Sequence, residues 1–573
     1  MATQRAWWAA DFETTPKPDK QTGRVRVWSW AIKWVEGTGD DYEPPADYYQ
    51  GTDISEFVDQ ACALGGIFWF HHLKFDASFL DAYLIDELGM ECRVQTTGNP
   101  PVGSFSAMVS SRGGHFQRRV NRELGMFECR DSLKKFPGTS IATLAETYGT
   151  DMRKGTIDYH KDRPIGYQPT DEEWAYQRND VEILATALKV PYEHGMRSLT
   201  IGADALNEYK ALHGFSRFRR TFPVLDEEVE DELRFAYRGG WAYTNPKYQG
   251  QLMQNIEGSV FDVNSMYPSV MVDNLFPVGS PVRISPWSEA PETHPLWIKG
   301  GLISGRLRPG MLPMVQVKRN FRYPANQYLE EFEHVEWYGT NVDWELLHKH
   351  YEIEQMGCNG GFAFKGETGL FDRFMSKWME IKETSEGGHR DYAKYQLNNL
   401  WGKFSTTPIR SSKIPAHDKS GISYNTQPAV RIESVYLPVG IWTTSYGRAK
   451  VIKAAQSFGD RFLAGDTDSC HVLGTDPGEL DIHPTRIGAW KREKTFDQAV
   501  YLRPKAYANR IVEDNGDKDI QVHISGLPRA LTEGSTMEEI RMGAHWLGKL
   551  TPAYVPGGCI LNETDYVIGG QTT

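Results

Sequence analysis

Three aspartates that are far apart in the sequence most constrain how this chain folds and what it does. Asp262 ends a predicted strand at 259–263, and Asp466 and Asp468 occupy the turn of a predicted strand–turn–strand unit at 461–473. We call these three residues the downstream cluster. Mg²⁺ takes one or two carboxylates together with substrate phosphates. Two such ions about 4 Å apart stabilise both the attacking and the leaving oxygen of a phosphoryl transfer.

A predicted helix favours this interpretation over an ordinary turn, in which aspartate is also common. Arg390, Lys394, Asn398 and Trp401 recur at helical spacing and therefore lie on one face. A stripe of cations and an amide beside an aromatic ring suits a triphosphate and a base. The same stripe is also typical of a solvent-exposed polar face. Lys382, on the preceding predicted helix, adds a second phosphate contact.

A second acidic set, the upstream cluster, lies near the start of the chain. Asp11 and Glu13 place two carboxylates on the same side of a predicted strand. Asp76 follows, and Asp180 stands four residues after Tyr176 on one face of a predicted helix. Four carboxylates and a tyrosine suit two metal ions that orient water for hydrolysis of a phosphodiester. An Asp-x-Glu motif alone is a weak signal.

The composition predicts a multidomain globular protein without a membrane span. The chain has 573 residues, whereas single cores stop growing at roughly 250–300 residues. It contains no run of about 20 apolar residues. Its six cysteines form no CxxC pair, which argues against a zinc site or a disulfide framework. The net charge of −12 runs against nucleic-acid binding unless basic residues cluster locally.

The pattern of elements also predicts how the clusters are connected. Two predicted helices, 371–383 and 391–404, form a hairpin whose turn contains the glycines 387–388. The stretch 268–371 is rich in proline and glycine and predicts an inserted subdomain. The turn-rich stretch 410–436 predicts a protruding β-hairpin.

Longer motifs around these residues resemble those of a known family. The A, B and C motifs of family B DNA polymerases resemble segments 261–268, 394–402 and 466–469. Their Tyr-x-Gly-Gly and Lys-x-Tyr motifs resemble segments 237–240 and 505–507. The order of the motifs and the chain length resemble the protein-primed branch, closest to the phage phi-twenty-nine type. The resemblance runs nearly from end to end.

The resemblance implies a mixed α/β, multidomain fold. An RNase H-like exonuclease domain of the DnaQ type is expected first, followed by a right-hand polymerase domain with palm, fingers, thumb and two insertions. The implied boundaries are 1–200 for the exonuclease domain, 201–273 and 438–530 for the palm, 274–370 and 405–437 for the two insertions, 371–404 for the fingers and 531–573 for the thumb.

The resemblance further implies roles in DNA synthesis. Asp262, Asp466 and Asp468 are expected to be catalytic, with metal held by Asp262, Asp468 and the Val263 carbonyl. The expected nucleotide-binding residues are Val263, Tyr267, Lys382, Lys394, Asn398 and Trp401. Of these, Tyr267 stacks on the sugar and excludes a 2′-hydroxyl. The expected DNA-binding residues of this region are Tyr237, Gly239, Gly240, Ser265, Lys505 and Tyr507.

The N-terminal segments resemble a 3′–5′ proofreading exonuclease. The implied catalytic residues are Asp11, Glu13, Asp76, Lys154, Tyr176 and Asp180, with metal held by Asp11, Glu13 and Asp180. The residues expected to grip a single-stranded 3′ end are Thr14, His72, Phe75, Ser132 and Leu133. Aromatic stacking in such a grip contributes about 1–3 kcal/mol per base and tolerates any sequence.

Cofactors and partners follow from the same resemblance. It implies two Mg²⁺ ions in each active site, with Mn²⁺ as a substitute. It implies primer–template DNA and dNTPs as partners, a terminal protein whose hydroxyl primes synthesis, and no membrane. A monomer encoded by a virus and acting in the cytoplasm of a bacterial host is expected.

Three positions depart from the family pattern. His72 stands where asparagine is usual, Trp401 replaces a usual tyrosine, and Ala464 stands where tyrosine often precedes the acidic turn. Two rival functions also stay open. One keeps only the nuclease and uses the C-terminal part to hold DNA, and the other is a DNA-binding packaging or scaffold protein. Neither rival function explains both acidic clusters.

Overall fold

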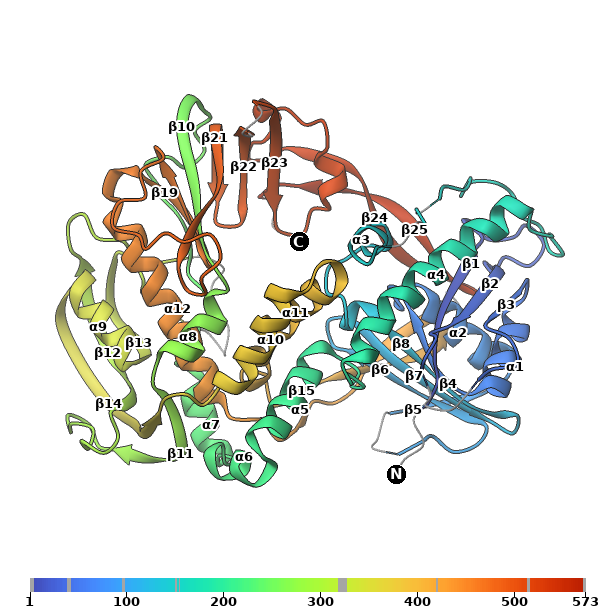
Figure 1. Cartoon of the computed structure of the whole chain (residues 1–573), viewed down its shortest axis with the longest axis horizontal. Coiled ribbons are helices and arrows are strands. Elements are labelled where there is room, and N and C mark those ends of the chain that lie inside the picture. Colours follow the sequence, from blue (N-terminus) through green and yellow to red (C-terminus); the bar gives the residue numbers. More distant parts are fainter. Residues whose placement is uncertain are drawn as a thin grey trace.

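The chain forms two bodies that lie side by side, and strands near the C-terminus reach from one to the other (Figure 1). The computed structural model describes residues 5–38, 43–94, 98–149, 152–153, 155–317, 327–418, 421–512 and 516–569. Across these ranges, no helix is both long enough and apolar enough to cross a membrane.

The N-terminal body contains eight strands and four α-helices. The strands are β1 (Trp7–Thr14), β2 (Val27–Trp34), β3 (Tyr48–Gly51), β4 (Gly66–Phe70), β5 (Glu91–Val94), β6 (Ser104–Ser110), β7 (His115–Arg122) and β8 (Gly125–Asp131). The helices are α1 (Ile54–Leu64), α2 (Asp76–Ala82), α3 (Ile141–Thr147) and α4 (Asp171–Glu193), with short π- and 3₁₀-helical turns at Tyr83–Glu87 and Ser132–Lys134. The central strand β1 runs parallel to β4 and antiparallel to β2.

Alternating side chains explain why β1 lies at the centre of this body. Trp7 packs in one core with Val181 of α4, whereas Trp8 packs in a second core with Phe57 of α1. A strand covered on both faces is apolar at successive positions. Helix α4 begins directly after its N-cap Thr170, which forms a capping box with Glu173.

The second body is built on a seven-stranded antiparallel sheet with the order β23-β22-β21-β10-β20-β19-β9. Its strands are β9 (Ala242–Thr244), β10 (Met253–Val263), β19 (Phe462–Asp466), β20 (Ser469–Leu473), β21 (Trp490–Arg503), β22 (Ala506–Val512) and β23 (Lys518–Ile524). Helices α8 (Met266–Asp273) and α12 (Leu437–Ser457) accompany this sheet, and a 3₁₀ turn covers Gly459–Arg461. The strand–turn–strand unit predicted at 461–473 is confirmed by β19 and β20.

The predicted inserted subdomain forms a separate four-stranded sheet with the order β11-β14-β12-β13. Its elements are β11 (Phe276–Ile284), β12 (Leu296–Leu307), β13 (Glu331–Thr340), α9 (Asn341–His350) and β14 (Tyr351–Glu367). Neighbouring strands are antiparallel throughout this sheet.

A helical hairpin stands over the seven-stranded sheet. It consists of α10 (Asp372–Thr384) and α11 (Gly387–Phe404), and the helices before it are α5 (Ile201–His213), α6 (Phe215–Thr221) and α7 (Glu227–Arg234). The prediction that glycines 387–388 form the turn is wrong, because α11 already begins at Gly387. A Cβ on Gly388 would lie 2.2 Å from the Tyr148 ring. These glycines therefore allow the start of α11 to approach the N-terminal body.

The prediction of a protruding hairpin at 410–436 is half right. Strands β16 (Ser412–Asp418) and β17 (Gly421–Thr426) form the hairpin, and the short β15 (Ile409–Arg410) and β18 (Val430–Arg431) pair at its base. The hairpin does not protrude, because β16 pairs with β6 and extends the N-terminal sheet to ten strands. Pairing between segments 300 residues apart leaves no local signal in the sequence.

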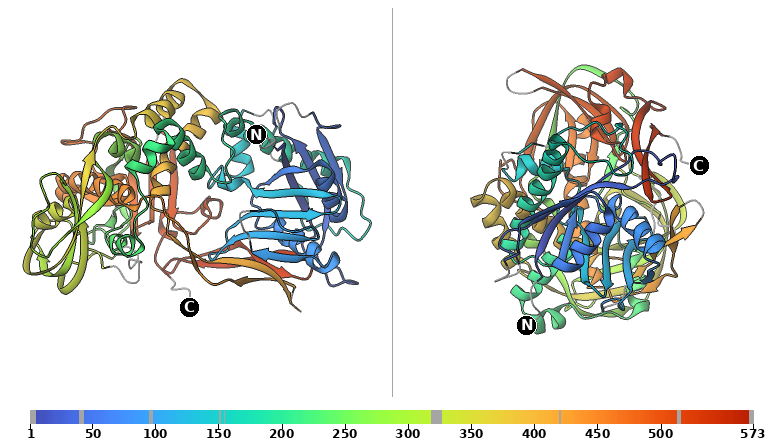
Figure 2. Two further views of the ribbon diagram at one scale, coloured as in Figure 1. Left: turned by 90° about the horizontal axis from the view of Figure 1, so that it is seen from below. Right: turned by 90° about the vertical axis from the view of Figure 1, so that its right-hand side faces the viewer.

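The C-terminal ribbon completes the connection between the bodies. It consists of β24 (His545–Val555) and β25 (Gly558–Val567), preceded by 3₁₀ turns at Arg529–Thr532 and Met537–Glu539. Figure 2 shows the ribbon and the β16–β17 hairpin running together between the two bodies. At their meeting point the Tyr424 hydroxyl donates to Asp81 at 2.8 Å. Asp81 also pairs with the buried Arg118 at 2.7 Å, and Tyr424 packs against Tyr554.

Candidate active sites

The strand register brings the downstream cluster together at one end of the seven-stranded sheet. Asp262 on β10 lies opposite Ser469 on β20, and Asp466 on β19 also lies opposite Ser469. The backbone N–H of Val263 donates to the Asp468 carbonyl at 2.9 Å, which fixes the acidic turn against the end of β10. The three predicted carboxylates therefore come from the end of β10, the end of β19 and the turn between β19 and β20.

Burial and mutual repulsion make this cluster unfavourable without a cation. Burial, followed by the charge of Asp468, raises the pKa of Asp262 to about 7. Burial, followed by the charge of Asp466, raises the pKa of Asp468 to about 6. An opposite charge nearby favours the ionised form of a carboxyl group, so a bound cation would relieve this repulsion.

Asp466 differs from the other two aspartates in its partner. Its carboxylate accepts a hydrogen bond from Lys505 Nζ at 2.7 Å. Asp262 and Asp468 instead line a cavity, together with Val263. The geometry therefore places two carboxylates in a space that a cation and a substrate can enter, with the third carboxylate held beside them.

A cavity of about 1060 Å³ lies over these carboxylates. This volume is at the upper end of the range for small-molecule sites, which is about 300–1,000 Å³. Residues predicted to bind metal, nucleotide or DNA line it, namely Asp262, Val263, Ser265, Tyr267, Lys382, Lys394, Asn398, Trp401 and Asp468. Arg390 adds a further cation from α11.

Two contacts join the helical hairpin to the end of β10. Lys382 Nζ donates to Ser265 Oγ at 3.0 Å, and the rings of Tyr267 and Trp401 lie 4.5 Å apart between centroids. Ser265 has a φ of 48° and turns the chain from β10 into α8. Cations of the hairpin therefore lie next to the carboxylates, which is the arrangement that a metal-bound triphosphate requires.

The predicted Tyr-x-Gly-Gly segment packs against the acidic turn. A Cβ on Gly240 would lie 2.6 Å from the Thr467 side chain and 3.0 Å from the Tyr267 hydroxyl, so the close approach requires glycine. The Gly239 carbonyl accepts a hydrogen bond at 3.0 Å from a buried arginine of α12. Tyr237 packs against the edge of the adjoining core.

The predicted Lys-x-Tyr pair lies on the other side of the cluster. Lys505 holds Asp466, as described above. The Tyr507 ring packs against His471 and His523, with centroid distances of 4.9 and 5.0 Å. Tyr507 and Asp262 both line a small cavity of about 80 Å³. The predicted primer-end residues are thus immediate neighbours of the carboxylates.

The upstream cluster is assembled from one strand and two helices. Asp11 and Glu13 lie on β1, Asp76 begins α2, and Asp180 lies on α4. Asp76 is buried, and burial followed by the charge of Asp11 raises its pKa well above the usual value for aspartate. Packing of the two helices on opposite faces of β1 brings these acids into one place.

Tyr176 lies within this cluster, one turn before Asp180 on α4. Its pKa is raised chiefly by burial and then by the charges of Asp180 and Glu13. Its hydroxyl lies 2.7 Å from the Tyr159 hydroxyl. Glu13 and Asp180 therefore both lie near this phenol, which is suited to orient a water molecule or a phosphate oxygen.

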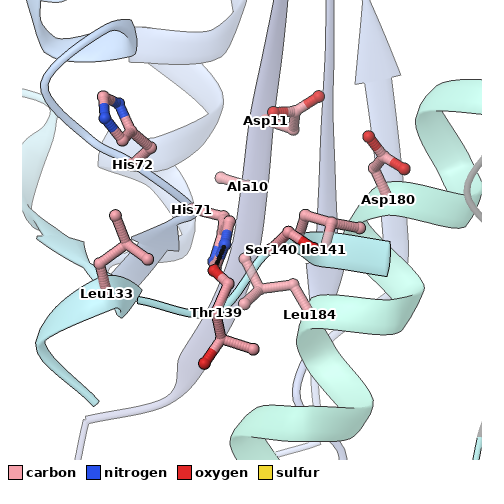
Figure 3. A pocket seen from close by; sticks show the side chains of 10 residues that line it. All are labelled: Ala10, Asp11, His71, His72, Leu133, Thr139, Ser140, Ile141, Asp180 and Leu184. Atoms are coloured by element: carbon pink, nitrogen blue, oxygen red, sulfur yellow. Dashed lines mark hydrogen bonds between the residues drawn. The ribbon is translucent and has the colours of Figure 1, made fainter. Parts of the chain in front are cut away.

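A cavity of about 360 Å³ opens beside the upstream cluster (Figure 3). Asp11 from β1 and Asp180 from α4 line it. His71, His72 and Leu133 also line it, and His72 and Leu133 lie away from the two aspartates. Among the described residues, the wall of this cavity includes neither lysine nor arginine.

Two residues predicted to grip a single strand, Ser132 and Phe75, are not part of the cavity lining. Ser132 is fully buried, and its hydroxyl lies 2.9 Å from His71 Nδ1. The other ring nitrogen of His71 lies 2.8 Å from the Thr139 carbonyl. Phe75 precedes α2 and packs against Phe79 at 5.5 Å.

Thr14 and His72 lie at or just after the ends of strands of the N-terminal body. Thr14 ends β1, and its carbonyl accepts a hydrogen bond from Trp28 at 3.2 Å. His72 has a φ of 74°, a left-handed conformation in which asparagine is also enriched. The predicted catalytic Lys154 lies outside the described residues.

The donor atoms of both clusters suit a hard cation. In the described ranges, no three side chains of His, Cys, Asp or Glu are arranged to hold a metal ion. Mg²⁺ does not require such a set, because it keeps several waters and takes substrate phosphates. Asp262, Asp468 and the Val263 carbonyl supply only oxygen donors, as do Asp11 and Asp180.

The residues of the larger cavity that are absent from the sequence prediction include two charged residues of one strand. Lys491 and Glu493 on β21 line it, because Asp262 lies opposite Lys491 in the strand register. No motif marks β21, so the sequence offered only two charged residues separated by one position.

Comparisons with known proteins identify one family. Residues 137–486 match the family described as DNA polymerase type B, organellar and viral. The chain is 33% identical to a DNA polymerase of Bacillus phage Nf, over 98% of this chain and 100% of the relative. It is 32% identical to the DNA polymerase of Bacillus phage phi29, over 98% and 99% of the two chains.

Solved structures of the phage phi29 DNA polymerase share this fold. One is a complex of that polymerase with primer–template DNA and incoming nucleotide substrates, with a TM-score of 0.89, 31% identity and coverage of 98% of this chain and 100% of that chain. An orthorhombic crystal form of the same polymerase has a TM-score of 0.90, with the same identity and coverage. The mixed α/β, multidomain prediction is confirmed.

Proposed function

The chain belongs to the type B DNA polymerases of organelles and viruses, and from this premise we propose that it copies primer–template DNA from dNTPs and also degrades DNA from the 3′ end. One observation carries the synthetic activity. Two half-buried carboxylates, Asp262 and Asp468, share a cavity with the cations Lys382 and Lys394. A triphosphate with its metal ions fits between them.

In this proposal the protein's own groups position the nucleotide. Lys382 and Lys394 bind the triphosphate, and Tyr267 packs against the sugar, where it excludes a 2′-hydroxyl. Asn398 and Trp401 border the nascent base pair. Positioning of this kind supplies much of the rate in phosphoryl transfer, because little covalent chemistry is required of the protein.

Asp262, Asp468 and the Val263 carbonyl would hold two Mg²⁺ ions, with Mn²⁺ as a substitute. Bound there, the ions would stabilise the charge on the attacking 3′-hydroxyl oxygen and on the leaving pyrophosphate. Lys505 keeps Asp466 turned toward the primer side, and Tyr507 supports the primer end. Ser265 and the Tyr-x-Gly-Gly segment contact DNA without reading its sequence, which suits a copying enzyme.

We assign the 3′–5′ exonuclease to the upstream cluster. Asp11, Glu13 and Asp180 would hold its metal ions, and Asp76 and Tyr176 complete the cluster. On the family resemblance, we propose that Lys154 assists catalysis in this site. The lack of cations in the described wall of the cavity suits a single-stranded end, which is gripped by stacking and hydrogen bonds from residues such as His72, Phe75 and Leu133.

Protein priming is a further part of the proposal. The two relatives reported above are phage polymerases, and on the family resemblance we take the regions 274–370 and 405–437 to be the two insertions of the protein-primed branch. The first region would contact a terminal protein and the second would enclose the template, which favours processive, strand-displacing synthesis. Incubation with a candidate terminal protein and dATP should yield a covalent protein–nucleotide product. The enzyme would then act as a phage-encoded monomer in the bacterial cytoplasm.

A primed template tests the two main activities together. With Mg²⁺ and dNTPs the primer should lengthen, and with Mg²⁺ alone it should shorten. Chelation of Mg²⁺ by EDTA should stop both reactions. Shortening without lengthening would favour a nuclease that only holds DNA, and binding without either reaction would favour a packaging or scaffold protein.

A further inference from the structure

Lys491 is a charged residue of the nucleotide cavity that no sequence motif marks. It lies on β21 directly opposite Asp262 on β10. It lines the large cavity together with Glu493, whereas the intervening Arg492 is exposed and lies outside the cavity wall. The side chain of Lys491 therefore enters the cavity from the sheet, on the side opposite the helical hairpin.

The distance from Lys491 to Asp262 leaves the ammonium group available for a substrate. Lys491 Nζ lies 3.9 Å from Asp262 Oδ1, which is longer than a hydrogen bond of about 2.7–3.2 Å. Lys505 on the same sheet donates to Asp466 at 2.7 Å. Lys505 is thus occupied by its aspartate, whereas Lys491 is only loosely paired and its side chain is 36% exposed.

Four cations face one space from two sides. Lys382, Arg390 and Lys394 come from the helical hairpin, and Lys491 comes from the sheet. Burial lowers the pKa of Lys382, and the charges of Lys394, Arg390 and Lys491 lower it further. Like charges that face one cavity repel one another. A polyanion placed between them would be attracted to all of them, so the repulsion would become binding energy.

We propose that Lys491 binds the triphosphate of the incoming nucleotide from the sheet side, opposite Lys382 and Lys394. The inference rests on the proposed function, because it takes the cavity to be the nucleotide site. A lysine suits this task as a compact point charge with three rotatable donors. The alternative is that Lys491 acts only through Asp262, as a counter-charge that a metal ion replaces.

Substitution of Lys491 distinguishes these two roles. In Lys491→Ala, the KM for each dNTP should rise about tenfold, which corresponds to the loss of one charge-assisted hydrogen bond. The kcat should stay within about twofold, and the increase should be equal for all four dNTPs, because phosphate contacts carry no base information. Lys491→Arg should restore most of the affinity.

The reverse reaction provides a second readout that uses pyrophosphate as the probe. When the enzyme cleaves the primer end with pyrophosphate, the KM for pyrophosphate should rise in Lys491→Ala by a factor similar to that for dNTPs. A counter-charge acting only through Asp262 would instead change kcat or the Mg²⁺ requirement and leave both KM values unchanged. That result would overturn the proposal.

Arg492→Ala is the matched control, because it removes the same charge from the neighbouring position outside the cavity. Its KM for dNTPs should stay at the wild-type value. Exonuclease activity of both variants should also match wild type, which shows that each is folded. If the wild-type enzyme fails to extend a primer, the proposed function fails. If it extends while Lys491→Ala keeps a normal KM, only the role of Lys491 fails.

Discussion

The two acidic clusters use similar carboxylates but differ in the charge of the walls around them. The downstream cavity is lined by Lys382, Arg390, Lys394 and Lys491. In the described part of the chain, the wall of the upstream cavity contributes histidines and apolar groups instead of these cations. The difference corresponds to the proposed substrates. A triphosphate brings several negative charges at once, whereas a 3′-terminal phosphodiester brings one.

The clusters also differ in what holds them together. The downstream acids come from two strand ends and one turn of a single sheet, so backbone hydrogen bonds fix their spacing. The upstream acids come from β1, α2 and α4, so side-chain packing fixes theirs. A site held by strand register tolerates little movement, while three of the cations around it, Lys382, Arg390 and Lys394, come from a helical hairpin.

The strongest test of the comparison is whether each cluster serves a separate reaction. Asp262→Asn should reduce primer extension roughly 10³-fold, because several kcal/mol of charge stabilisation are lost. Shortening of the primer without dNTPs should continue at the wild-type rate. Asp180→Asn should show the opposite pattern. Gel analysis of a labelled primer measures both rates. Parallel loss of both reactions in either variant would mean that the clusters do not act separately.

The difference in charge between the two cavity walls predicts an effect that is smaller but is also confined to one of the two activities. Lys394→Ala removes a cation that only the downstream cavity has, so the KM for dNTPs should rise roughly 10–100-fold. The exonuclease rate should not change. Steady-state extension with a single dNTP measures the first quantity, and degradation of a single-stranded oligonucleotide measures the second. An exonuclease defect of similar size would show that the two cavities share this cation.

The residues of the two sites also differ in whether they could be predicted from the sequence. Asp262, Asp466 and Asp468 could be grouped from the sequence because each lies at a strand end or in a turn, and such ends meet when strands pair. Lys491 could not be found, because its place depends on the register of β21 against β10, which no local pattern sets. The same limit applies to the surroundings of Ser132, which the resemblance identified but whose burial and contact with His71 depend on tertiary packing.

The fold shows the same division between local and long-range signals. Helix α4, with its capping box at Thr170, and the β19–β20 unit could be predicted because short-range periodicity and turn chemistry determine them. The pairing of β16 with β6 and the contact of Tyr424 with Asp81 could not. These contacts join segments hundreds of residues apart, and the partners are chosen by tertiary packing.

Trp401 gives a third test, with a moderate effect on selectivity in the downstream site. Its ring lies 4.5 Å from that of Tyr267, so Trp401→Tyr changes the wall beside the nascent base pair. Misinsertion should change by about 2–10-fold, since aromatic pairs contribute about 0.5–1.5 kcal/mol, and correct synthesis should continue. The measurement belongs in the Asp180→Asn background, where errors are not removed. Equal error rates in the two proteins would contradict the prediction.

The smallest effect is expected from His72 in the upstream site, and its neighbour His71 is the control. His72 has a left-handed φ of 74°, so His72→Asn should leave stability unchanged or raise it by less than about 1 kcal/mol. His71→Asn should be destabilising, because both ring nitrogens of His71 have partners. Thermal unfolding measures both changes. The exonuclease rate of His72→Asn should stay within about twofold of wild type, because the upstream cavity is proposed to grip DNA through several weak contacts. A tenfold loss would mean that the imidazole ring, and not the backbone conformation, is what this position contributes.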